Sequence, residues 1–382
     1  MISDGFDTHT LRVRKIGRSG TLKESVMFLR STDPRYDSRL LRALEILSAN
    51  DFIISGVFWT RTGEEDIFLQ NFRDFSNFSK VAKFGSGIKN VHNQCLWQLF
   101  QAKRIWGSPA HVIYACDLDT FLIALFLKPL KGYKVVFDQF DPYESRFKIK
   151  AICFFIRQIE KLFVQFADVY VVPKNERAMR NHPHTVVVPN MPMVSKIESV
   201  ENFTSPYLFY GGILNSDRGL LTAIEVMRKR INWVFVIAGF GELENKIKEV
   251  TLPNVVFLGK RSPSQIMALA ASSSVILGTY DSTVSNNRNS ASNKVAEAAL
   301  LNVPIVISTG SGQEAEVKKF HLGFVVNYGI QEDLDKVLQS LEDTPWEPIG
   351  YLSESYLRRF RWLETSAHLS DAIREVLLNE KN

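Results

Sequence analysis

The sequence predicts an α/β protein with two Rossmann-like, doubly wound domains. Twelve short apolar runs, rich in β-branched residues, recur along the chain with helix-length segments between them. Runs that are almost continuously apolar are typical of parallel strands buried on both faces. Twelve strands exceed one ordinary sheet, so we expect two sheets of six strands each.

Six of the expected strands lie in the first half of the chain and six in the second. Those of the first half are Ser25–Arg30, Phe52–Trp59, His111–Asp117, Lys134–Asp141, Val169–Lys174 and Thr185–Asn190. Those of the second half are Pro206–Gly212, Val234–Gly241, Val255–Lys260, Val275–Tyr280, Pro304–Thr309 and Phe324–Asn327. Two such domains usually bind ligand in the cleft between them, at the carboxyl ends of the strands.

Composition divides the chain into five segments. Residues 1–22 are basic and without periodic pattern, which predicts an N-terminal arm. Residues 191–205 are polar and interrupted by proline, which predicts a linker between domains at 23–190 and 206–350. Residues 351–382 place apolar side chains at helical spacing. We expect this C-terminal helix to pack back on the N-terminal domain.

The composition is that of an ordinary soluble protein. Hydrophobic residues make up 45% of the 382 residues, and the net charge of +5 favours anionic partners. The three cysteines have no disulfide or zinc spacing, which indicates a reducing compartment. We find no signal-peptide pattern and no apolar run long enough to span a membrane. We therefore expect a cytoplasmic protein, either free or peripheral on the inner face of the cell membrane.

The stretch 292–306 is the most informative part of the sequence. It predicts a short apolar helix, a tight turn and a buried strand. Glu297 lies within that helix, where an unpaired buried charge would be costly. Asn293 and Lys294 lie one turn earlier on the same face. A polar cluster at a helix start of an α/β protein is suited to hold the hydroxyls and phosphates of a nucleotide.

A glycine-rich turn follows the first strand of the second half. Gly211 and Gly212 let the backbone approach a ligand, and Arg218 stands at the head of the next expected helix. A guanidinium beside free helix N–H groups can bind a diphosphate. The alternative interpretation is a simple strand-to-helix turn whose arginine faces water.

A second turn, ending at Gly241, resembles half of a dinucleotide fingerprint. It lacks the third glycine, and Glu242 would repel a phosphate. The structural interpretation, a tight turn that closes a βα unit, is therefore favoured here.

Acidic residues gather after two neighbouring strands of the first half. They are Asp117, Asp119, Asp138, Asp141 and Glu144. Carboxylates at the carboxyl ends of neighbouring strands could act as a base or bind sugar hydroxyls. Some could equally cap the helices that follow. No histidine-rich pattern accompanies them, so we expect no metal site.

The segment 147–164 predicts a helix with much apolar surface and several basic residues. One interpretation is docking on an anionic membrane. The other is a core helix with a solvated basic face. A second basic-aromatic cluster at 358–362 favours the membrane. No nucleic-acid-binding module is recognisable, so we expect no nucleic-acid partner.

The order of the motifs in the second half resembles a known family. The motifs are Gly211-Gly212, Arg218-Gly219, Ala238-Gly239-Phe240-Gly241, Asn254–Gly259, Asn293-Lys294 with Glu297, and Pro304-Ile305-Val306. Together they resemble the retaining, nucleotide-sugar-dependent glycosyltransferases of the group 1 type, which have the GT-B fold. The resemblance is good over 205–330 and fainter but collinear over 25–190.

The resemblance implies roles for several residues. Glu297 corresponds to the second of two family glutamates and is implied to bind the ribose hydroxyls. The first glutamate falls at Asn289, whose amide can also hydrogen-bond to hydroxyls. A family arginine falls at Gly212 and a family lysine at Arg218. One cation of the diphosphate site is therefore missing, unless Arg288 or Lys294 substitutes for it.

Other family positions are less well matched. Where many relatives have a histidine, this chain has Cys116, with Asp117 beside it. Asp117 and Asp138 remain the candidate catalytic acids or bases of the first half, and Asp119, Asp141 and Glu144 the candidate acceptor-side residues. The choice of nucleotide base depends on loops, among which Lys260 and Arg261 are candidates.

The function that the resemblance implies is hexosyl transfer from a nucleotide diphosphate sugar to a glycan or lipid-linked acceptor, with retention of anomeric configuration. Such a reaction belongs to cell-envelope polysaccharide or glycoconjugate synthesis. It needs no cofactor besides the sugar nucleotide. Two alternatives remain open: a sugar-nucleotide epimerase or phosphorylase on the same scaffold, and a non-catalytic protein that binds nucleotide sugars.

Overall fold

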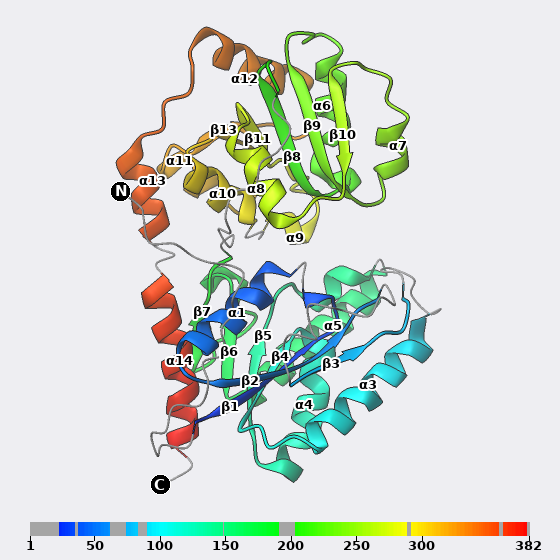
Figure 1. Ribbon diagram of the computed structural model, residues 1–382, viewed down its shortest axis with the longest axis vertical. Helices are drawn as coiled ribbons and strands as arrows, with labels where there is room; N and C mark the ends of the chain where they lie inside the picture. Colours follow the sequence, from blue (N-terminus) through cyan, green and yellow to red (C-terminus); the bar gives the residue numbers. More distant parts are fainter. Residues whose placement is uncertain are drawn as a thin grey trace. The chain divides into compact units, whose positions relative to one another are not determined.

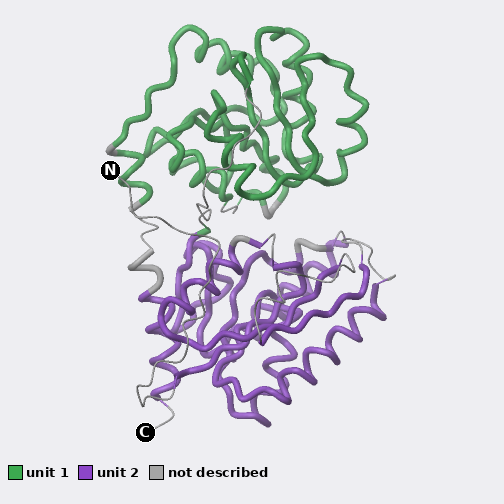
Figure 2. The backbone as a smooth tube through the Cα atoms, in the orientation of Figure 1, with its two compact units in different colours: residues 1–10, 190–361 green, residues 11–189, 362–382 purple. Residues whose placement is uncertain are grey.

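The chain forms two compact α/β units. The computed structural model describes residues 23–34, 37–61, 74–82, 90–147, 149–190, 203–288, 292–358 and 362–379. The chain divides between Pro189 and Asn190, and residues from Trp362 onward return to the first unit (Figure 2). We call the unit before the division the N-terminal unit and the other the C-terminal unit. The expected arm at 1–22 and most of the expected linker lie outside the described residues.

The N-terminal unit is built on a parallel sheet of seven strands in the order β3-β2-β1-β4-β5-β6-β7. The strands are β1 Ser25–Arg30, β2 Ile53–Trp59, β3 Phe75–Phe78, β4 Val112–Cys116, β5 Lys134–Asp138, β6 Val169–Val172 and β7 Thr185–Val187. The α-helices are α1 Ser38–Ala49, α3 Val91–Trp106, α4 Leu118–Lys131 and α5 Lys150–Phe163, and the short 3-10 helices are η3 Tyr143–Arg146, η4 Val164–Phe166 and η5 Asn175–Arg177.

Helices cover both faces of this sheet (Figure 1). On one face, Leu40 and Leu47 of α1 pack against Val26 and Phe28 of β1. On the other face, residues of α3 and α4 such as Trp97 pack against the alternate side chains of the same strands. Burial on both faces explains why these strands are almost continuously apolar in the sequence.

The C-terminal unit has a parallel sheet of six strands in the order β10-β9-β8-β11-β12-β13. The strands are β8 Tyr207–Ile213, β9 Val234–Phe240, β10 Val255–Gly259, β11 Val275–Leu277, β12 Ile305–Ser308 and β13 Gly323–Val326. The helices are η6 Ser216–Arg218, α6 Leu220–Met227, α7 Glu244–Lys248, α8 Pro263–Ala271, α9 Ser285–Arg288, α10 Asn293–Leu301, α11 Glu314–Lys319, α12 Gln331–Asp343 and α13 Gly350–Arg358. Two separate apolar clusters fill the two faces of the sheet.

The predicted fold class is confirmed, and all twelve predicted strands are present. The structure adds β3, which the sequence analysis missed. Its four residues are Phe75-Ser-Asn-Phe78, and each is only half-buried. A strand this short, at the end of the sheet order, has no continuous apolar run to mark it.

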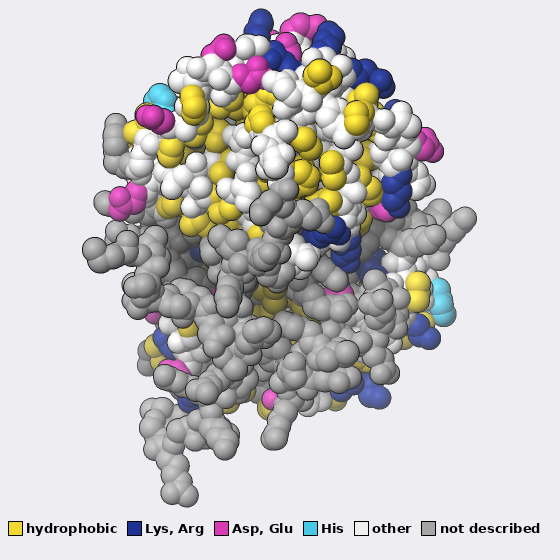
Figure 3. Space-filling view, turned by 45° about the horizontal axis from the view of Figure 1, so that its top comes forward, with side chains coloured by type: hydrophobic (Ala, Val, Ile, Leu, Met, Phe, Trp, Pro, Cys, Tyr) yellow, Lys and Arg dark blue, Asp and Glu magenta, His cyan; other side chains and the backbone are white. Residues whose placement is uncertain are grey.

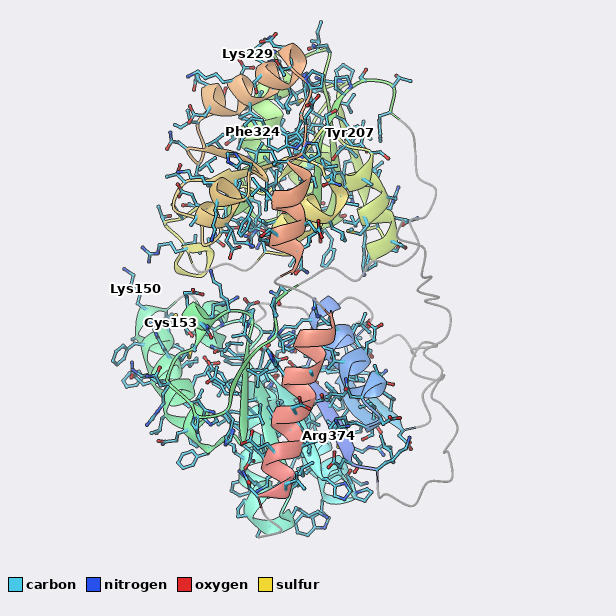
Figure 4. The ribbon with its side chains drawn as sticks, turned by 90° about the vertical axis from the view of Figure 1, so that its left-hand side faces the viewer. Lys150, Cys153, Tyr207, Lys229, Phe324 and Arg374 are labelled. Atoms are coloured by element: carbon cyan, nitrogen blue, oxygen red, sulfur yellow. The ribbon has the colours of Figure 1, made fainter. Side chains whose placement is uncertain are left out.

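The expected single helix at 351–382 is two helices, and they belong to different units. Tyr356 of α13 is buried in the C-terminal unit, with its ring 5.4 Å from that of Phe320. Helix α14, Trp362–Leu378, buries Leu369 and Ile373 in the N-terminal core, and Arg374 donates to the carbonyl of Asn50 at 2.7 Å (Figure 4). The apolar stripe read from the sequence was therefore the sum of two separate faces.

Candidate functional site

The two glycine turns lie side by side at the carboxyl ends of β8 and β9. The register places Gly212 opposite Gly239, and a Cβ atom on Gly239 would clash with the Gly212 carbonyl. The turn at Gly241 also packs on the backbone, because a Cβ there would lie 2.7 Å from the amide nitrogen of Leu214. Glu242 accepts a hydrogen bond from the backbone of Ser216 at 2.6 Å. Gly239, Gly241 and Glu242 of the second turn thus pack against the backbone of the first turn, which follows β8.

Arg218 is held in place at the end of η6. Its guanidinium lies 4.3 Å from the ring centroid of Tyr280, and it donates to Asn287 Oδ1 at 3.3 Å. Asn287 is buried and donates in turn to Asp217 at 2.8 Å and to the carbonyl of Asp281 at 2.9 Å. The next residue, Gly219, has a φ of 70° and begins α6. The arginine is therefore fixed within the unit, and the interpretation of a side chain that merely faces water does not hold.

Lys294 reaches from α10 to the end of β8. A Cβ atom on Gly212 would lie 3.0 Å from its Nζ, and Nζ lies 4.9 Å from the ring centroid of Tyr210. Within the described ranges, no carboxylate comes within 4.0 Å of this ammonium. The helix begins at Ser292, whose hydroxyl accepts from the backbone of Lys294 at 3.3 Å. The cap fixes the first turn of α10 and so directs the lysine toward the glycine turn.

Two tyrosines lie between these cations. The hydroxyl of Tyr280 lies 2.8 Å from Ser292 Oγ, and that of Tyr210 donates to the carbonyl of Ile213 at 2.6 Å. Burial raises the pKa of Tyr210 to about 12. Burial would raise the pKa of Tyr280 too, but Lys294 and Arg218 outweigh it and lower that pKa. The two cations therefore favour the ionised form of Tyr280.

Burial disfavours the charged form of Lys294. However, Tyr280, Tyr210 and Glu297 more than offset the burial, and the pKa of Lys294 is raised. The lysine thus carries its charge at neutral pH. A charged ammonium that forms no ion pair within 4.0 Å among the described residues is well suited to an anionic ligand.

Glu297 lies one turn further along α10 and is half-buried between buried alanines. Burial raises its pKa, and Lys294 partly opposes this shift. Among the described residues, no hydrogen-bond donor reaches its carboxylate, which leaves the carboxylate oxygens available to a ligand that can donate.

The other predicted donor residues are more scattered. Asn293 is the first residue of α10, and Asn289 lies outside the described residues. Lys260 follows β10 and packs 5.3 Å from the ring of Phe240, while Arg261 donates to the carbonyl of Leu258. The structure therefore brings together Gly212, Arg218, Lys294 and Glu297 around Tyr210 and Tyr280. The sequence analysis overlooked both tyrosines, although Tyr280 ends a predicted strand.

In the N-terminal unit, two of the predicted acids are buried in ion pairs. Asp117 has a φ of 68°, pairs with Arg30 and accepts from the backbone of Phe140 at 3.1 Å. Asp138 pairs with Arg39 at 2.6 Å and accepts from the hydroxyl of Tyr114 at 2.6 Å. The ring of Phe140 lies 4.1 Å from the guanidinium of Arg30 and 5.2 Å from that of Arg39. Both carboxylates help to hold the strand ends together, and burial raises the pKa of Asp138 although Arg39 opposes the shift.

The remaining acids of this edge differ from one another. Asp141 pairs with Arg177 at 3.0 Å, and Glu144 lies in η3. Asp119 is buried in the first turn of α4, and its carboxylate has no hydrogen-bond partner among the described residues. Burial raises the pKa of the Cys116 thiol, so the residue at the family's histidine position stays protonated. The described ranges hold no group of three or more His, Cys, Asp or Glu residues that could bind a metal ion.

Comparison with known proteins defines the class. The family described as Glycosyl transferases group 1 matches residues 195–353. Sucrose-phosphate synthase from Thermosynechococcus elongatus resembles the structure with a TM-score of 0.68 at 11% identity, over 94% of this chain and 100% of that chain. Anabaena Alr3699/HepE in complex with UDP and glucose has a TM-score of 0.65 at 14% identity, over 91% and 99%. The lipopolysaccharide outer core galactosyltransferase WaaB has a TM-score of 0.60 at 14% identity, over 92% and 99%.

At such low identities the structural likeness establishes the fold, which is the GT-B fold of these glycosyltransferases. A search of curated protein sequences gave no significant match. The resemblance to the group 1 glycosyltransferases is confirmed over residues 195–353, which match that family.

Proposed function

We propose that this protein transfers a hexose from a nucleotide diphosphate sugar to a glycan or lipid-linked acceptor, with retention of anomeric configuration. The observation that carries the proposal is the position of the Lys294 ammonium, beside Gly212 and without a carboxylate partner in the described ranges. Arg218 lies against Tyr280 in the same cluster. The two cations match the charge of a diphosphate.

Each part of the donor has a candidate partner. Lys294 and Arg218 bind the diphosphate, together with the backbone of the turn at Gly211 and Gly212. Glu297 accepts hydrogen bonds from the ribose hydroxyls, because its oxygens have no donor of their own among the described side chains. Asn289 would hydrogen-bond the sugar hydroxyls, in keeping with its place in the motif.

The chemistry requires little acid-base help from the protein. The bond from the anomeric carbon to the diphosphate oxygen breaks, and the acceptor oxygen bonds to that carbon from the same face. The departing phosphate oxygen takes the acceptor proton. Lys294 and Arg218 stabilise the charge that develops on the leaving diphosphate. This route requires no proton transfer by Asp117 or Asp138, both of which form ion pairs in the N-terminal unit.

The comparisons suggest the first substrates to test. The HepE structure contains UDP and glucose, and WaaB is named for the lipopolysaccharide outer core. We therefore propose a uridine diphosphate hexose as donor and a cell-envelope glycan as acceptor. No metal or further cofactor is part of the proposal.

The test is a thermal-shift screen with UDP, GDP, ADP and their sugars, because a ligand that binds the native state raises the melting temperature by mass action. We expect one nucleotide series to stabilise the wild type and to lose this effect in Glu297→Ala. Release of the nucleotide that depends on an acceptor would then identify a transferase. Turnover without an acceptor would identify an epimerase instead, and stoichiometric binding without any turnover would identify a binding protein.

A further inference from the structure

We propose that one surface of the N-terminal unit docks on an anionic lipid bilayer. This surface, which we call the docking surface, comprises α5, η4 and the C-terminal ends of α3 and α4. Its most exposed aromatic side chains are Trp106, Phe126, Phe154, Phe155 and Phe166. The proposal does not rest on the proposed glycosyl transfer, because it concerns a surface formed by helices of the N-terminal unit.

Helix α5 has apolar side chains on its outward side as well as on its inward side, where Ile156 and Phe163 pack on the core. A surface helix turns its apolar stripe inward and its charges outward. In α5 the fully buried residue is Glu160, which accepts from the backbone of Tyr143 at 3.1 Å. The outward side carries Phe155, Ile159 and Leu162, at the spacing of one helical face, and Phe155 is 66% exposed. A core helix with a solvated basic face would account for Ile156 and Phe163, but it does not explain this exposed apolar side.

The apolar surface continues from α5 onto the neighbouring helices. The rings of Phe163 and Phe166 lie 6.1 Å apart, and Lys128 of α4 donates to the carbonyl of Phe166 at 3.2 Å. Two residues before that lysine, Phe126 is 73% exposed, and Leu130 follows one turn later.

The same surface reaches the end of α3. Lys131 donates to the carbonyl of Trp106 at 2.8 Å and lies 5.6 Å from its ring, and Trp106 is 57% exposed. Large exposed aromatic groups that extend over several elements mark an interaction surface, whereas isolated exposed apolar residues are ordinary.

The charges on α5 indicate which kind of surface the helix would bind. Lys150, Arg157 and Lys161 are exposed and lie along one edge of the helix, and Figure 4 shows Lys150 projecting from it. The helix has no exposed acid, because Glu160 is its one acidic residue and is buried. By contrast, the face of the C-terminal unit in Figure 3 mixes basic and acidic side chains.

Basic side chains beside exposed aromatic groups fit an anionic bilayer, in which rings enter the interface and cations meet lipid headgroups. A second copy of this chain would place like charges against each other and is disfavoured. No helix in the described ranges is long and apolar enough to cross a membrane, so the contact we propose is peripheral.

The experiment is co-sedimentation of the full chain with phosphatidylcholine vesicles, with and without phosphatidylglycerol. We expect binding to the anionic vesicles that falls as salt is raised. Phe154→Gln/Phe155→Gln should weaken this binding about tenfold or more. Ile231→Gln is the matched control, because Ile231 is 85% exposed in the C-terminal unit and should leave binding unchanged. Lys150→Gln/Arg157→Gln/Lys161→Gln should abolish the preference for anionic lipid.

Three results would overturn the proposal. The first is that the wild type does not bind anionic vesicles. The second is that the double phenylalanine variant binds them as the wild type does. The third is that the wild type binds no lipid and forms a dimer, which the double phenylalanine substitution dissociates. Melting temperatures of all variants check that each remains folded. The thermal shift with nucleotides is measured without vesicles. It therefore tests the proposed function independently of lipid binding.

Discussion

The ammonium of Lys294 lies 3.0 Å from the point at which a side chain on Gly212 would begin. The two residues come from different elements, the start of α10 and the end of β8. The family that the chain resembles has an arginine at the position of Gly212. Here the glycine leaves that space open, and the lysine fills it. We propose that Lys294 of α10 takes the place of that arginine in a diphosphate site.

This relationship predicts the effect of a methyl group at position 212. Gly212→Ala should push Lys294 aside and lower nucleotide diphosphate affinity about tenfold, since a charge-assisted hydrogen bond contributes roughly 1.5–3 kcal/mol. Gly132→Ala is the control, because Gly132 also has a positive φ, of 75°, but nothing lies within 4 Å of its added Cβ. Calorimetric titration checks both. Equal affinity in the two variants would show that Lys294 does not depend on the space at Gly212.

The lysine itself should contribute to the binding of phosphates more than of nucleosides. Lys294→Gln should weaken binding of a nucleoside diphosphate about tenfold to a hundredfold and barely change binding of the nucleoside. Lys318→Gln serves as the control, since Lys318 is exposed and already pairs with Glu314 at 2.5 Å. Competition titrations with both ligands measure the difference. Equal losses for nucleoside and diphosphate would instead indicate a general disturbance of the site.

Glu297 should lower the stability of the unliganded protein at neutral pH. Its pKa is raised above the ordinary value of 4.5 by burial, so its stabilising contribution is complete below that value and is lost as the pH rises through the folded-state pKa. Glu297→Gln should therefore raise the free energy of unfolding at pH 7 by about 1 kcal/mol, and the gain should shrink near pH 4. Urea unfolding at the two pH values measures it. Destabilisation at pH 7 would show that Glu297 is held in a favourable ion pair.

The buried pair of Arg39 and Asp138 should support the fold of the N-terminal unit. Removing one partner leaves a buried charge uncompensated, so Arg39→Ala should cost about 3–5 kcal/mol. Nucleotide affinity should be unchanged as long as the protein remains folded. Arg228→Ala is the control, because that arginine forms an exposed pair with Glu225 at 2.8 Å. Thermal unfolding followed by nucleotide titration tests this, and loss of affinity at full folding would assign Arg39 a role in the site.

The fold was largely predictable from the sequence because strands of parallel sheets carry their own signal. Apolar runs such as 234–240 are buried on both sides and need no partner to be recognised. Two parts of the fold were not predicted correctly. Strand β3 is half-buried and has no such run, and the last two helices share one continuous pattern although they pack in different units.

The site was predictable only in part. Glu297 and Arg218 could be found because they lie in local motifs next to predicted strands. The position of Lys294 beside Gly212 depends on how β8 and α10 come together, which no local pattern contains. The ion-pair partners of the acids could not be predicted from local sequence either. Arg30 and Asp117 are 87 residues apart, and Arg39 and Asp138 are 99 residues apart.

We propose that the start of α10 and the turn after β8 hold the diphosphate of a sugar nucleotide. The most direct measurement is a crystal structure of the protein with a bound nucleoside diphosphate. We predict a phosphate oxygen within hydrogen-bonding distance of Lys294 Nζ and the ribose hydroxyls on Glu297. A nucleotide bound elsewhere, with Lys294 and Glu297 facing only solvent, would contradict the account.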